Sequence, residues 1–261
     1  MNYLVAADTD VGIVKETNQD SVCVMTAQTE LGPVVLALIA DGMGGLSKGE
    51  LASATVTREF MRWFENTFPS YFSHFDWQQL SNDWDRKLKE INLKILEYGQ
   101  QNYVKLGTTF SGMLFVGDEC LLAHIGDSRV YLINTEVKQL TQDHTVVARE
   151  ILRGNLTVDE AEKDPRKNVL LQCIGASRTV MPDIAILSVV PDSTYLICSD
   201  GFRHMITSEE FAAFLDPTHN NDEKDMQRNL RYLIDIAKKR AERDNISAVL
   251  IKTIRQGAQR G

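Results

Sequence analysis

Aspartates stand where apolar, strand-like segments meet turns, and this pattern is the part of the sequence best suited to chemistry. Five aspartates share such a position: Asp20, Asp41, Asp127, Asp200 and Asp244. A single aspartate at a strand end is an ordinary turn residue, and Asp-Gly is a common turn dipeptide. Several of the five also have a glycine or serine beside them. If these strand ends converge, the five carboxylates form a site made entirely of oxygen ligands.

Such a site needs a cation, because like charges do not crowd into a small volume without one. No cysteine or histidine cluster accompanies the aspartates, and hard oxygen ligands favour Mg²⁺ or Mn²⁺ over Zn²⁺. Gly42, directly after Asp41, would let a backbone carbonyl approach the same ion. Two ions about 3.5–4 Å apart, bridged by one carboxylate, activate water and hold a phosphoryl group. The pattern therefore predicts an acidic divalent-metal site suited to phosphoryl hydrolysis.

The elements that must position these aspartates are strands in groups, separated by helices in groups. Short apolar or β-branched runs predict strands at 3–7, 21–27, 34–40, 108–116, 119–125, 129–133, 137–140, 184–190, 194–198 and 246–254. Apolar residues at helical spacing predict helices from near Ser47 to 68, over 80–98, from near Ser208 and over 222–242. Because the helices do not alternate with the strands, the order favours an α+β fold with antiparallel sheets. Short turns between 108 and 140 predict an antiparallel meander.

Length and composition are those of an ordinary globular protein. The chain has 261 residues, of which 43% are hydrophobic and 25% charged, so we predict a single domain over 1–261. The formal net charge of −8 argues against nucleic-acid or membrane partners. The apolar run 34–40 is too short to span a bilayer, and the N-terminus lacks a signal peptide's basic region. Four scattered cysteines predict buried thiols in a reducing compartment, so we expect a cytoplasmic protein.

Seven short motifs stand in order along the chain. They are Lys15–Asp20, Asp41–Gly45, Gly107–Thr109, Gly126–Arg129, Leu140–His144, Ser199–Gly201 and Asp244–Ser247. Together they resemble the motifs of the metal-dependent serine/threonine protein phosphatases, the phosphatase 2C-like (PPM) family, in its bacterial form. Each motif is short, but the ordered set is specific and extends from about residue 8 to residue 252.

The resemblance implies a fold and a metal centre. The fold is a β-sandwich of two antiparallel sheets with helices on both outer faces, in four layers. A binuclear Mn²⁺ or Mg²⁺ centre is expected at one end of the sandwich. Asp41 would bridge both ions, and Gly42 would give its carbonyl to one of them. Asp200 and Asp244 would hold the other ion, and Asp20 would bind directly or through a water.

The resemblance also implies further parts and a reaction. Asp127 matches the aspartate that holds a third, weaker metal ion, and the stretch 145–174 matches the mobile flap beside the site. Lys15 replaces the usual arginine, and we predict that it contacts phosphate as a point charge. The implied reaction is direct attack of a metal-activated water on phosphoserine or phosphothreonine in proteins. Phosphorylated proteins, including a Ser/Thr kinase, are the expected partners of an expected monomer.

Two other functions stay open at this stage. Lys15 in place of arginine fits a regulatory phosphoprotein-binding domain on the same fold, in which the metal serves structure only. The segment 4–11 resembles the haloacid-dehalogenase motif, in which Asp8 would be the nucleophile. That fold requires alternating strands and helices, whereas here a second strand follows at once.

Overall fold

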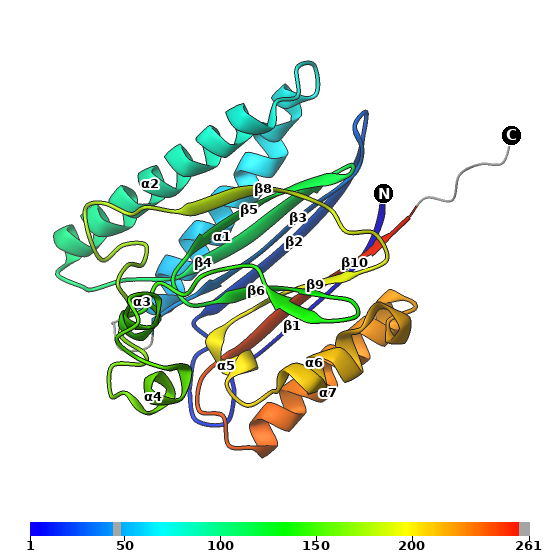
Figure 1. Cartoon of the computed structure of the whole chain (residues 1–261). Coiled ribbons are helices and arrows are strands. Elements are labelled where there is room, and N and C mark those ends of the chain that lie inside the picture. The colour runs from blue at the N-terminus through cyan, green and yellow to red at the C-terminus, as the bar shows by residue number, and fades with distance from the viewer. Residues whose placement is uncertain (44–47, 256–261) are drawn as a thin grey trace, which may run out of the picture.

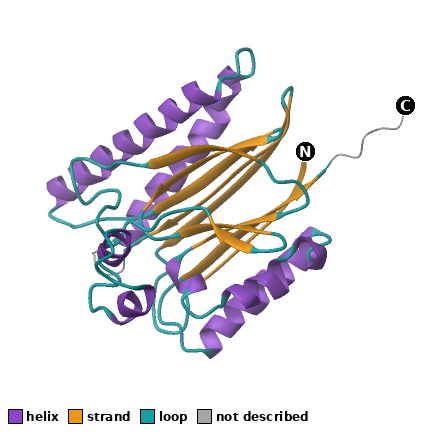
Figure 2. Cartoon of the chain, in the orientation of Figure 1, coloured by secondary structure: helices purple, strands orange, loops and turns teal. Residues whose placement is uncertain are grey.

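Two five-stranded sheets pack face to face between two layers of helices, as the computed structural model shows (Figures 1 and 2). The structure describes residues 1–43 and 48–255. The motif glycines Gly44 and Gly45 and the predicted helix start near Ser47 lie outside the described residues. The strand pairings are antiparallel in both sheets. The predicted α+β sandwich with helices on both faces is therefore confirmed.

The two sheets draw their strands from different parts of the chain. The first sheet runs in the order β2 (Asp20–Thr29), β3 (Gly32–Asp41), β4 (Phe110–Val116), β5 (Glu119–Ile125) and β8 (Asp183–Ser188). The second runs in the order β1 (Asn2–Asp10), β10 (Ile246–Ile254), β9 (Thr194–Cys198), β6 (Arg129–Ile133) and β7 (Val137–Gln139).

Strand β3 explains how a continuous apolar run fits an antiparallel sheet. Successive side chains of a strand point to opposite faces. Leu36 and Leu38 join the core beneath the helices, while Val35 and Ile39 join the core between the two sheets. Both faces of β3 are therefore buried, which removes the polar alternation of a half-exposed strand.

Helices cover the outer face of each sheet (Figure 1). The first sheet is covered by α1 (Gly49–Asn66) and α2 (Trp77–Asn102), with the short 3₁₀ turn η1 (Phe68–Tyr71) between them. The second sheet is covered by α6 (Ser208–Leu215) and α7 (Glu223–Lys239), joined through the 3₁₀ turn η2 (Pro217–His219). The short helices α3 (Val146–Leu152), α4 (Val158–Lys163) and α5 (Asp200–Arg203) lie at one end of the sandwich.

The predicted meander between 108 and 140 is wrong, because the chain changes sheets in its middle. Strands β4 and β5 pair in the first sheet, whereas β6 and β7 pair in the second. Both edges of β5 are taken, by β4 and β8, so β6 has no free edge beside it. The crossing turn begins at Gly126, whose φ of 110° suits glycine. The same turn carries Asp127 to the end of the sandwich.

Two smaller predictions concern the cysteines and the membrane. All four cysteines are buried free thiols, as predicted. Among residues 1–43 and 48–255, none of the helices combines the length and the apolar character that crossing a bilayer requires.

Candidate metal centre

Pairing of β2 with β3 places the first two aspartates side by side. Asp20 begins β2 and Asp41 ends β3, and the two residues are register partners across the ladder. Backbone contacts fix Asp41 further, because its N–H donates to Thr109 Oγ1 (3.0 Å) and its carbonyl accepts from the Thr109 N–H (2.9 Å). The hydroxyl of Thr108 also donates to the Asp41 carbonyl, at 2.9 Å. The motif Gly107–Thr109 therefore acts as the frame of Asp41, a role the sequence did not reveal.

The other three aspartates arrive from the second sheet. Asp200 opens α5 directly after β9, and Asp244 stands two residues before β10, the neighbour of β9. Asp127 lies in the crossing turn just before β6, which pairs with the other side of β9. The end of β9 and the beginnings of its two neighbours, β10 and β6, therefore lie side by side. The predicted convergence of strand ends is visible in the backbone.

Glycine is required where these turns touch. A Cβ on Gly201 would lie 2.2 Å from the carbonyl oxygen of Asn245, and a Cβ on Gly42 would lie 2.5 Å from that of Gln19. Neither distance is possible for a real side chain. The turns that carry Asp200 and Asp244 therefore pack backbone against backbone, which the absence of a side chain permits.

Asn245 ties the loop before β2 to the turn before β10. Its Oδ1 accepts from the Gln19 N–H at 2.9 Å, while its Nδ2 donates to the carbonyls of Val11 (2.9 Å) and Thr17 (3.2 Å). The side chain is 2% exposed. Its place in the Asp244–Ser247 motif was the sequence signal for this role, but its partners lie more than two hundred residues away and could not be read from spacing.

The electrostatics show that the five carboxylates share one region. Burial raises the pKa of Asp41 well above its usual value, and the charges of Asp20, Asp200, Asp127 and Asp244 raise it further. Burial also raises the pKa of Asp20 to about 7, which hydrogen bonding from Ser247 offsets only in part. For Asp127, burial and the charge of Asp200 raise the pKa to about 6. Mutual repulsion of this kind is relieved by a cation.

The donor set fits a hard divalent cation. Asp20 is buried, and its Oδ2 has no hydrogen-bond partner among the described residues. The lone pairs of this oxygen are therefore free to coordinate a cation. Within residues 1–43 and 48–255, no three acidic, histidine or cysteine side chains form a coordination shell by themselves. A divalent cation would supply the positive charge that these carboxylates lack between them.

Lys15 lies at the edge of this cluster. Its Nζ is 2.8 Å from Asp244 Oδ1, and about three tenths of its side chain is exposed (29%). The loop that carries it is held by Asn245 through the carbonyls of Val11 and Thr17. A partly exposed positive charge therefore lies in direct contact with one carboxylate of the acidic site.

Two arginines that the sequence analysis did not consider support the Asp127 turn. Arg203 donates to the Asp127 carbonyl at 3.1 Å and lies 3.7 Å from its carboxylate. Arg129 makes a bidentate contact with Asp143, at 2.9 and 2.8 Å. The arginine of the Gly126–Arg129 motif was the available signal, whereas Arg203 comes from α5 and depends on the fold.

The predicted flap segment, 145–174, contains α3 and α4 and is anchored at its two ends. The N–H of Val146 donates to the Val169 carbonyl (2.9 Å), and the N–H of Leu171 to that of His144 (2.7 Å). Ile174 pairs with Thr108 as an isolated bridge. The segment therefore ends against the residue that holds the Asp41 carbonyl.

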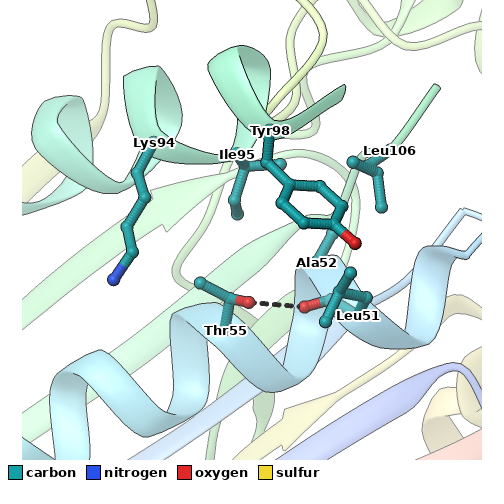
Figure 3. Close-up of a pocket in the computed structure, with 7 residues that line it drawn as sticks. All are labelled: Leu51, Ala52, Thr55, Lys94, Ile95, Tyr98 and Leu106. Atoms are coloured by element: carbon teal, nitrogen blue, oxygen red, sulfur yellow. Dashed lines mark hydrogen bonds between the residues drawn. The ribbon is translucent and has the colours of Figure 1, made fainter. Parts of the chain in front are cut away.

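An apolar hollow between α1 and α2 is separate from the carboxylates (Figure 3). It is lined by Leu51, Ala52, Thr55, Lys94, Ile95, Tyr98 and Leu106. Two of its polar groups are already engaged, because Thr55 donates to the Leu51 carbonyl (2.7 Å) and Lys94 pairs with Glu59 (2.5 Å), and the hydroxyl of Tyr98 is a third. The hollow thus has little polar chemistry to offer a ligand.

Asp8 is engaged in a structural ion pair, so the haloacid-dehalogenase hypothesis is wrong. Its buried carboxylate contacts the guanidinium of Arg231, which also lies 2.9 Å from Asp10. Lys238 contacts Asp10 at 2.9 Å as well. These pairs fasten α7 to β1. The fold is an antiparallel sandwich in which β2 follows β1 directly, not an alternation of strands and helices.

We expect Asp8→Asn to keep catalytic turnover within about twofold and to lower the free energy of unfolding by about 1.5–3 kcal/mol, the usual range for a hydrogen bond to a charged group. Urea unfolding and an activity assay measure the two effects. Loss of turnover at full stability, or a phosphorylated Asp8 trapped during turnover, would contradict this structural role.

Comparison with known proteins gives the family. The protein phosphatase 2C family profile matches residues 13–235. A protein phosphatase 2C-type protein of Streptococcus pyogenes is 31% identical over 250 residues, which cover 95% of this chain and 96% of that protein. The S. agalactiae serine/threonine phosphatase superposes with a TM-score of 0.83 at 29% identity, over 97% of this chain and 100% of that one.

A third relative is similar and was solved with metal. The catalytic domain of the serine/threonine protein phosphatase PstP, in complex with two manganese ions, has a TM-score of 0.78 at 27% identity and covers 97% of this chain and 100% of that one. The chain belongs to the protein phosphatase 2C family in its bacterial form, as the motifs predicted. It is a protein serine/threonine phosphatase.

Proposed function

We propose that this phosphatase hydrolyses phosphoserine and phosphothreonine in proteins with Mn²⁺ or Mg²⁺ held by its five clustered aspartates. The observation that carries the proposal is the raised pKa of Asp41, which results from burial and from four neighbouring carboxylates at once. A cation among these carboxylates would relieve their mutual repulsion. The two manganese ions in the PstP structure support the choice of metal.

Each aspartate has a proposed role that follows from its position. Asp41 is the register partner of Asp20 across the β2–β3 ladder, and the charges of all four other aspartates raise its pKa. From this central position it would bridge two ions. The carbonyl of Gly42 would reach one ion. Asp200 and Asp244, on touching turns, would hold the other.

Asp20 would bind directly or through a water, and Asp127 would hold a third, weaker ion. When bound, the ions neutralise phosphate charge and lower the pKa of an attacking water. Lys15, beside Asp244, would contact a phosphate oxygen and orient the ester. The aspartates of the chain thus set the position of the metal charge, and Lys15 adds the positive charge on the substrate side.

The proposed substrates are phosphorylated proteins, among them a Ser/Thr kinase, and the enzyme would act as a monomer with one catalytic domain over 1–261. The hydrolysed bond leaves a serine or threonine hydroxyl and inorganic phosphate.

Hydrolysis of p-nitrophenyl phosphate and of a phosphothreonine peptide tests the proposal. We expect turnover with Mn²⁺ or Mg²⁺, none in EDTA, and a loss of about a thousandfold or more in Asp200→Asn, which corresponds to about 4 kcal/mol. Asp118→Asn is the matched control, because Asp118 is exposed in the β4–β5 turn. Folded protein that binds Mn²⁺ but hydrolyses neither substrate would instead favour a regulatory phosphoprotein-binding domain.

A further inference from the structure

Glu242 is a buried carboxylate beside the candidate metal centre that the proposed reaction does not use. It lies in the turn between α7 and β10 and is 4% exposed. Its Oε1 accepts two backbone hydrogen bonds, from the N–H of Arg243 at 2.7 Å and from the N–H of Asp244 at 2.9 Å. Glu242 therefore shapes the turn that presents Asp244.

The second oxygen of Glu242 faces a histidine. Its Oε2 has no hydrogen-bond partner among the described residues, but the Nδ1 of His204 lies 3.6 Å away. The Nε2 of the same ring lies 3.8 Å from Asp200 Oδ2. The imidazole thus stands between the buried Glu242 and the aspartate that opens α5.

The negative charge at Glu242 requires an explanation beyond the turn itself. The carboxylate accepts the two backbone N–H groups as charge-assisted hydrogen bonds, and burying its charge costs free energy unless positive charge nearby offsets it. The cation proposed at Asp200 and Asp244 would supply that charge, and the ring of His204 lies against the second oxygen of Glu242 on the same side. Carboxylates that orient the immediate surroundings of a metal ligand in this way often matter for metal affinity.

We propose that Glu242 is a positioning residue that sets the affinity of the site for its divalent cation. Its Oε1 accepts the N–H of Asp244, and its Oε2 faces the ring of His204, which lies 3.8 Å from Asp200. One buried carboxylate therefore lies against the surroundings of both proposed ligands of the same ion. The inference rests on the proposed function, because it takes Asp200 and Asp244 as ligands. It concerns metal affinity, and Glu242 touches neither substrate nor reacting atoms.

Calorimetric titration of the metal-free full chain with Mn²⁺ tests this role without measuring activity. In Glu242→Gln we expect the dissociation constant for Mn²⁺ to rise about tenfold, within the range found for residues that support metal ligands. His204→Asn, at a side chain that is 31% exposed, should fold in any case and shift the constant in the same direction. The double variant should be no weaker than the worse single one, because the two residues act in series.

Glu210→Gln is the matched control. Glu210 lies on α6 and pairs with Arg240 at the end of α7 (2.6 Å), without contacting an aspartate of the cluster. Its dissociation constant should equal that of the wild type. A Mn²⁺ affinity within twofold of wild type in both Glu242→Gln and His204→Asn would overturn the inference, whatever their stability.

Asp200→Asn distinguishes a failure of the role proposed for Glu242 from a failure of the proposed ligand set. If Asp200→Asn loses Mn²⁺ binding while Glu242→Gln and His204→Asn keep it, the inference alone fails. If Asp200→Asn binds Mn²⁺ as tightly as the wild type, the proposed ligand set is wrong, and the role of Glu242 falls with it.

Discussion

Asp41→Asn is expected to abolish turnover and, at the same time, to make the metal-free protein more stable. Asp41 is the carboxylate whose pKa is raised by burial and by four like charges. Above its ordinary pKa, the folded protein must either keep a proton on this cluster or tolerate the repulsion, and both disfavour folding. Asparagine has nearly the same shape and no charge, so the penalty disappears together with the proposed bridge between two ions.

We expect turnover with saturating Mn²⁺ to fall by at least about a thousandfold, or about 4 kcal/mol in the barrier. The free energy of unfolding in EDTA at neutral pH should rise, because the variant removes one charge from a buried group of like charges. Urea unfolding with and without Mn²⁺ measures both states. The stabilising effect of Mn²⁺ itself should shrink in the variant, because an ion that binds only the folded protein adds stability in proportion to its affinity.

Asp118→Asn again serves as the comparison, because it removes one exposed carboxylate far along the β4–β5 hairpin from Gly126. It should change neither turnover nor metal-free stability by more than about 0.5 kcal/mol. Metal-free Asp41→Asn that is clearly less stable than the wild type would show that the carboxylate makes a structural contact. That result would remove the main support for a cation-dependent cluster.

The sequence predicts those features of the candidate site that depend on residues adjacent in the chain. An apolar run must be buried, as β3 is on both faces, and an aspartate after such a run must stand at its end. The five aspartates, Gly42 and Lys15 could therefore be predicted as a site from the sequence, and all five aspartates lie in one region of the structure. Which sheet each strand would join was less visible. The exchange of sheets after β5 depends on β8 taking its free edge, some sixty residues later.

The supporting residues were beyond reach for the same reason. Thr109 and Asn245 accept hydrogen bonds from backbone groups that only the fold brings to them, and such partners have no fixed spacing in sequence. Glu242 accepts from its two neighbours in the chain, but its burial and its place beside His204 come from the fold. A motif indicates that a residue is important, but only the structure shows which atoms form hydrogen bonds with its side chain.

Metal-free protein is also expected to lose stability as the pH rises from about 5 to about 7, the reverse of ordinary acid denaturation. Burial raises the pKa of Asp20 from 3.8 to about 7 and that of Asp127 to about 6. In this interval the unfolded chain has released these protons while the folded protein keeps them. Because the folded state binds more protons, raising the pH favours unfolding. Above about pH 7 the loss should level off.

His124 acts in the opposite direction, because burial lowers its pKa from 6.5 to about 4. Its neutral folded ring stabilises the protein more as the pH rises towards 6.5. One imidazole is outweighed by Asp20, Asp127 and Asp41, whose pKa values are all raised. The net effect between pH 5 and 7 should be a loss on the order of a few kcal/mol, since one pKa unit corresponds to about 1.4 kcal/mol.

Urea unfolding in EDTA between pH 5 and 8, with the wild type and Asp20→Asn side by side, isolates this effect. The difference between the two proteins cancels His124 and all distant groups, and it should grow with pH until about 7, in favour of the variant. Saturating Mn²⁺ should remove or reverse the slope in the wild type, because metal ligands bind best without their protons. Metal-free wild-type stability that climbs steadily from pH 5 to 8, with Asp20→Asn following in parallel, would mean that the carboxylates do not repel one another. The cluster would then need no cation.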